Sequence, residues 1–148
     1  MNGDFFETGL RQALRKEFES HRLRELGDSS PFFSQLMEAF PVCGSKIDWD
    51  RVSDSIERVE EDIDLQTGQF AEFFDEVNQR CCLSGDVVYV GDGVTDFALV
   101  SSLKCMREIL PELLAVPQHH YLVAPDSSWC MCFTMEGWMG FGFRSSPV

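Results

Sequence analysis

The segment from Ser128 to Phe143 constrains the fold of this chain more than any other stretch. It reads SWCMCFTMEGWMGFGF, two apolar runs separated by Glu136-Gly137, a pattern typical of a β-hairpin. Alternate residues of a strand point to opposite faces of a sheet, and here both sets are apolar. Exposing either face would leave an apolar patch on the order of several hundred Å² in water. We therefore expect helices on both faces of the hairpin; the alternative is a partner on one face, such as a second copy in a homodimer.

A two-residue turn at Glu136-Gly137 would also fix the register of the hairpin. It places Met135 opposite Trp138, and alternation then places Phe133 opposite Gly140. Large side chains would face small ones on both sides, with an aromatic ring covering a strand glycine. This pattern predicts a packed sheet and does not indicate a ligand site.

The residues before Gly85 show helical periodicity, and those after it are rich in strands. Apolar residues recur every three or four positions in the segments 4–26, 31–39, 47–65 and 67–82. Past Gly85 we expect strands at 87–90, 119–124, 128–135 and 138–143, with a helix at 101–116. At 148 residues the chain has the length of one domain. We predict a single α+β domain over 1–148, in which N-terminal helices (about 4–82) pack on a C-terminal, mainly antiparallel sheet of about four strands (about 86–143).

The net charge of −13 restricts the partners of the chain. It opposes contact with nucleic-acid phosphates and favours a protein with a basic surface, drawn in by long-range steering. Between Asp48 and Glu76 there are eleven acids and two arginines, so the charge is concentrated in one region. We predict that this region binds the partner through the following acids: Asp54, Glu57, Glu60, Glu61, Asp62 and Asp64.

The apolar runs are short and interrupted by charges, so we expect no membrane span. The first residues lack a basic segment followed by an apolar core, which argues against a secretory signal. The six cysteines are then expected to be reduced thiols in the cytoplasm.

The stretch VVYVGDGVTD, residues 87–96, resembles the fourth motif of haloacid-dehalogenase-type phosphatases. The resemblance implies that Asp92 and Asp96 hold Mg²⁺. That family also requires an aspartyl nucleophile on an upstream apolar strand, and the nearest candidate, Asp62, follows Glu60 and Glu61. Only about thirty residues separate Asp62 from Asp92, too few for the parallel crossovers of such a site. We interpret the stretch as an acidic turn at a strand end; the alternative function is a small metal-dependent hydrolase using Asp92, Asp96 and His120.

The histidines and cysteines predict neither a metal site nor a catalytic residue, and we expect no cofactor. His119 and His120 are neighbours on a strand, so their rings point to opposite faces. Cys130 and Cys132 share a face and could form half a zinc site, but no second ligand pair accompanies them. With His119 they are the one conceivable nucleophile–base pair, and a buried thiol would be inert.

In layout and charge, the chain resembles the small acidic immunity proteins with which bacteria neutralise toxins. The stretch PQHHYLVAPDSSWCMCFTMEGWMGFGF is similar to C-terminal strands of such domains. The resemblance implies a non-catalytic, cytosolic binding protein whose acidic surface covers a basic toxin.

Overall fold

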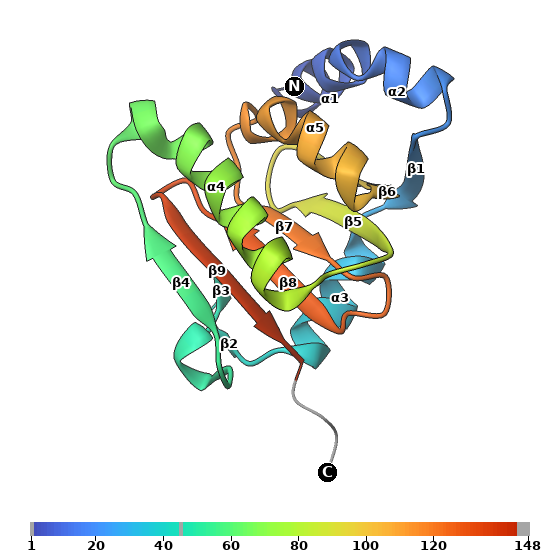
Figure 1. The fold of residues 1–148 in the computed structure, drawn as a ribbon. Helices are drawn as coiled ribbons and strands as arrows, with labels where there is room; N and C mark the ends of the chain where they lie inside the picture. Colours follow the sequence, from blue (N-terminus) through green and yellow to red (C-terminus); the bar gives the residue numbers. More distant parts are fainter. Residues whose placement is uncertain (1, 45, 145–148) are drawn as a thin grey trace.

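Seven strands form one antiparallel sheet in the order β1-β6-β5-β7-β8-β9-β4 (Figure 1). This is the arrangement in the computed structural model, which describes residues 2–44 and 46–144. The strands of the sheet are β1 Leu23–Asp28, β4 Ile56–Val59, β5 Asp86–Gly91, β6 Phe97–Ser102, β7 His120–Val123, β8 Trp129–Phe133 and β9 Trp138–Phe143. A separate two-stranded ladder joins β2, Val42–Cys43, to β3, Lys46–Ile47.

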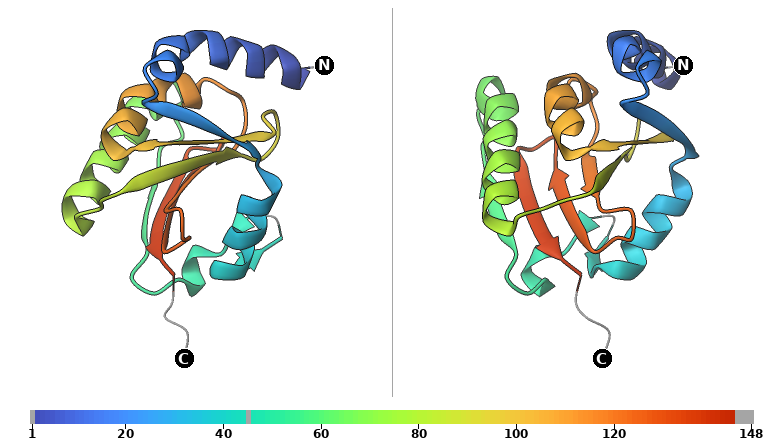
Figure 2. Two further views of the ribbon diagram at one scale, coloured as in Figure 1. Left: turned by 90° about the vertical axis from the view of Figure 1, so that its right-hand side faces the viewer. Right: turned by 45° about the vertical axis from the view of Figure 1, so that its right-hand side comes forward.

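Helices cover both faces of the sheet (Figure 2). The helices are α1 Asn2–Ala13, α2 Arg15–Glu19, α3 Ser30–Ala39, the 3₁₀ helix η1 Trp49–Arg51, α4 Ile63–Cys81 and α5 Leu103–Leu114. Helices α1, α4 and α5 pack on one face, and α3 with η1 packs on the other. Among the described residues, no helix combines the length and apolarity needed to cross a bilayer.

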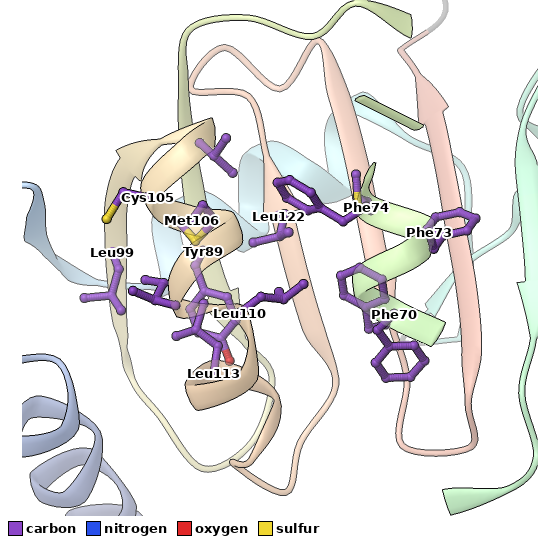
Figure 3. Packing of buried hydrophobic residues seen from close by; sticks show 14 of the residues in the cluster. Phe70, Phe73, Phe74, Tyr89, Leu99, Cys105, Met106, Leu110, Leu113 and Leu122 are labelled. Atoms are coloured by element: carbon purple, nitrogen blue, oxygen red, sulfur yellow. The ribbon is translucent and has the colours of Figure 1, made fainter. Parts of the chain in front are cut away.

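The larger core lies between the sheet and helices α4 and α5 (Figure 3). In α4 the apolar side chains recur with helical spacing, so that Phe70, Phe73 and Phe74 all point at the sheet. In α5 Met106 and Leu110 do the same beside them. Burying side chains of this size contributes about 1.5–3 kcal/mol each, so these two helices fix the sheet's position.

The α+β class is confirmed, but the prediction of about four strands is wrong, because the sheet has seven. Helices are not confined to the N-terminal half either, since α5 lies between β6 and β7. Two of the additional strands overlap segments predicted as helix: β4 lies within 47–65, and the first four residues of β1 lie within 4–26. Both are edge strands with few buried side chains, so their apolar residues do not form the alternating pattern from which a strand is predicted. Backbone pairing with β6 and β9 decides their conformation.

The hairpin of β8 and β9 lies inside the sheet, between β7 and β4, and both of its faces are covered as expected. Its register, however, differs by one residue from the prediction: Phe133 pairs with Met139, and Cys132 pairs with Gly140. The loop has one more residue than predicted. The Gly137 N–H donates to the Thr134 carbonyl at 3.0 Å, and Gly137 has φ +92°. A three-residue loop with a left-handed glycine is a common hairpin connection, and it shifts the pairing.

This register collects the large side chains on one face of the hairpin and the small ones on the other. Met131, Phe133 and Phe141 face α4, while the glycines of β9 leave a depression on the η1 side. The indole of Trp49 fills it: a Cβ on Gly140 would lie 2.4 Å from that ring. The glycines of β9 therefore leave the space that the Trp49 ring occupies.

Candidate functional site

The phosphatase-like loop between β5 and β6 is closed from inside by Gln118. The side-chain Oε1 of Gln118 accepts hydrogen bonds from three successive backbone N–H groups, those of Gly93 at 3.2 Å, Val94 at 2.8 Å and Thr95 at 3.1 Å. Successive backbone N–H groups of this kind can form an anion-binding nest. Here the protein's own amide oxygen occupies the nest, and Gln118 is only 3 % exposed.

The amide nitrogen of Gln118 continues this contact into a buried polar chain. Nε2 donates to Thr95 Oγ1 at 2.8 Å and to the Tyr89 hydroxyl at 3.0 Å, and Tyr89 lies 2.7 Å from His120 Nδ1. The Tyr89 hydroxyl thus accepts from Gln118 Nε2 and shares a second hydrogen bond with Nδ1 of His120. Burial, followed by the charge of His119, lowers the pKa of His120 to about 4. Each group satisfies the next, as stable buried networks require.

The three residues of the metal hypothesis do not come together. Asp92 and Asp96 are exposed and line a hollow of about 490 Å³ on the α3 face of the sheet. Asp92 Oδ1 accepts from the His119 N–H at 3.0 Å, so this carboxylate secures the turn. His120 belongs to the Gln118 chain and packs with Tyr89. Within 2–44 and 46–144, no three His, Cys, Asp or Glu side chains are grouped for a metal ion.

Cys130 and Cys132 are buried in the core on the α3 side. Burial raises the pKa of Cys132 to about 12 and raises that of Cys130 well above its ordinary value. The imidazole of His119 is engaged elsewhere, since its Nδ1 accepts from the Met135 N–H at 3.0 Å. At neutral pH both thiols stay protonated, which makes them poor nucleophiles.

The six acids predicted to bind a partner lie along one edge of the sheet. Asp54 precedes β4, Glu57 is on β4, and the others run from the end of this strand into the first turn of α4. All are exposed apart from Glu60, which is half-buried. Asp62 also has a structural role: its carboxylate caps α4 by accepting from the Asp64 N–H at 3.0 Å.

Large apolar side chains are exposed beside these acids, and the sequence did not reveal them. Their exposed fractions run from 45 % to 77 %, and they are Val59, Ile63, Leu65, Met135 and Trp138. Val59 pairs with Trp138 across β4 and β9, and the Glu60 N–H donates to the Gly137 carbonyl at 2.9 Å. Ile63 and Met135 line a common hollow. We call the six acids together with these five apolar residues the β4 surface.

A cleft of about 420 Å³ opens between the β2–β3 ladder, η1 and the end of the β8–β9 hairpin. Trp138 forms one wall, and its indole Nε1 donates to Glu57 Oε1 at 3.0 Å. Lys46 and Glu136 also line the cleft, and their charged groups lie 3.1 Å apart. We call it the tryptophan cleft. It adjoins the β4 surface because Glu57 and Trp138 belong to both.

Comparison with known proteins finds no family model that matches this chain and no significant match among curated proteins.

Proposed function

We propose that this chain is a non-catalytic binding protein that captures a basic protein through the β4 surface. One observation carries the proposal: the predicted acids and five exposed apolar side chains occupy the same edge of the sheet. Exposed apolar residues grouped in this way are typical of contact sites. An acidic border around them would select a partner of opposite charge.

The two kinds of side chain have different tasks in this proposal. The acids raise the association rate through steering, to which the net charge of −13 adds. Trp138 and its apolar neighbours are buried on contact and supply most of the affinity, as tryptophan does at many interfaces. The surface is held ready for contact, because the pairing of β4 with β9 and the Asp62 cap fix its backbone.

The biological role that we propose is neutralisation of a basic toxin in the cytoplasm, following the resemblance to bacterial immunity proteins. Such a role requires a stable, non-reactive surface. The chain's reactive candidates are engaged in its own structure: Gln118 fills the β5–β6 nest, and the thiols of β8 are buried. The alternative, a metal-dependent hydrolase using Asp92, Asp96 and His120, has less support, because His120 lies apart from the two aspartates and no third potential metal ligand among the described residues is grouped with them.

The test is capture of the partner from native lysate of the source cells, followed by calorimetry with the captured protein. The informative variant is Glu61→Lys with Asp64→Lys, which reverses two exposed charges and keeps the Asp62 cap. We expect its Kd to rise at least tenfold, because two attractive charges become repulsive.

A matched control carries the same change in net charge elsewhere. Glu38→Lys with Glu112→Lys alters exposed acids on α3 and α5, which line neither the tryptophan cleft nor the hollow shared by Ile63 and Met135. This control should bind within twofold of wild type at physiological salt, because neither acid belongs to the proposed surface and salt screens long-range charge. Equal loss of affinity in both variants would show that binding depends on net charge and not on the position of the acids. That result would refute the proposed site.

A further inference from the structure

The tryptophan cleft combines an aromatic wall with excess negative charge. Trp138 is 46 % exposed, and its hydrogen bond to Glu57 holds the ring in one orientation. The carboxylates that line the cleft are those of Asp48, Asp50, Glu57 and Glu136. Lys46 is the one cation among the lining residues that the structure describes, which leaves a net charge of −3.

From this arrangement we propose that the tryptophan cleft receives an arginine side chain of the protein partner, an inference that rests on the proposed function. A planar guanidinium stacks on an indole face and forms paired hydrogen bonds with carboxylates at the same time. The ammonium group of lysine is compact and strongly hydrated, so it would satisfy the carboxylates but use the ring less well. The volume of about 420 Å³ lies in the range of sites that hold small organic groups.

The cleft is also built to keep this geometry when empty. Trp49 lines it, is only 7 % exposed and packs closely against Gly140. Lys46 is paired with Glu136, whereas Asp48, Asp50 and Glu57 form no ion pair with any described residue. An incoming guanidinium would meet Glu57 and Asp50 without displacing an existing ion pair of the described residues.

Three peptides with one variable residue test the inference on the whole chain: acetyl-Gly-Arg-Gly-amide, its lysine analogue and its citrulline analogue. Citrulline has the shape of arginine without the charge. The readout is the Trp138 indole N–H resonance in ¹⁵N-labelled protein, assigned with Trp138→Phe. We expect a saturable shift with the arginine peptide, a weaker affinity with lysine and no saturation with citrulline.

Glu57→Gln provides the matched variant, because its amide oxygen still accepts from the Trp138 N–H while the charge is lost. We expect it to weaken arginine-peptide binding roughly two- to fivefold, as for a partly exposed ion pair. Glu38→Gln on α3 should leave binding unchanged. Equal binding of the arginine and citrulline peptides, or no effect of Glu57→Gln, would overturn the inference. A lysate partner that still depends on Glu61 and Asp64 would then leave the proposed function standing.

Discussion

Gln118 decides the character of the loop that most resembles a catalytic motif. One side chain accepts from three backbone N–H groups and donates to two hydroxyls, so the loop, β5 and β7 are joined through a single amide. Gly91 must lack a side chain to allow this, because a Cβ there would lie 1.9 Å from Gln118 Nε2. The first glycine of the phosphatase-like stretch therefore serves packing against Gln118.

Gln118→Ala should lower the free energy of unfolding by about 3 kcal/mol, because it leaves several buried polar groups without partners. Urea unfolding followed by circular dichroism measures the change. Gln35→Ala, at an exposed position of α3, is the control and should stay within about 0.5 kcal/mol of wild type. A similar loss in both variants would show that Gln118 does not hold the loop.

The stability of the protein should depend on pH through His120. Its pKa is about 4 in the folded state, chiefly through burial, and 6.5 is its ordinary value. Between these pH values the unfolded chain therefore binds more protons than the folded one. The free energy of unfolding is then unaffected by His120 above pH 6.5 and falls as the pH drops toward 4. The contribution is about 3 kcal/mol over this window. His120→Asn should flatten this slope in urea unfolding at pH 7 and 4.5, whereas His21→Asn at an exposed position should retain it.

At the scale of elements, the β8–β9 turn controls both the register of the hairpin and the position of β4. Gly137→Ala should lower the free energy of unfolding by at least about 2 kcal/mol, because φ is +92° and a Cβ would lie 1.9 Å from the Glu60 carbonyl oxygen. Gly68→Ala, in the exposed part of α4 with open space around it, should instead raise it by about 0.5–1 kcal/mol. Thermal unfolding of the two variants measures whether Gly137→Ala destabilises the protein and Gly68→Ala stabilises it. Equal effects of the two substitutions would contradict the observed turn.

The elements that the sequence predicts well are those whose side chains are buried in a regular pattern. Helix α4 and the strands of the hairpin have this property, and their existence and type are as expected. Strands β1 and β4 do not: Leu23 is the one buried residue of β1, and β4 alternates half-buried with exposed residues. Their conformation depends on hydrogen bonds to partners distant in the sequence, which no local pattern contains.

The candidate site shows the same division between local and distant information. The acids from Asp54 to Asp64 could be located from their density in the sequence. Their neighbours Met135 and Trp138 could not, because only the pairing of β4 with β9 brings the hairpin turn beside them. Val59 and Ile63 fitted the stripe of a predicted helix, but Val59 lies on the edge strand β4, Ile63 begins α4, and both side chains are exposed. A homodimer through the hairpin stays a prediction, with Trp138 and Phe143 as its exposed positions.

At the scale of the whole molecule, an apolar core lies on each face of the sheet, and we expect the thiols buried in these cores to react more slowly than the exposed ones. Cys43 and Cys82 are exposed, Cys81 is half-buried, and Cys105, Cys130 and Cys132 are buried. Burial also raises the pKa of all three buried thiols and of Cys81, and the thiolate is the reactive form. We expect an aromatic disulfide reagent to label two thiols rapidly in the native protein, Cys81 more slowly, and all six after unfolding in guanidinium.

Mass spectrometry of partly labelled protein assigns each modified cysteine, and Cys43→Ser should reduce the rapid phase from two thiols to one. The buried thiols lie on both faces: Cys105 is on α5 and packs in the core between that helix and the sheet, and Cys130 and Cys132 are on β8 and pack under α3 and η1. Their protection therefore reports on each layer separately. Rapid labelling of Cys130 or Cys132, with Cys105 still protected, would show that α3 and η1 do not cover their face of the sheet. It would also contradict the tryptophan cleft as described, because Cys132 is one of its lining residues.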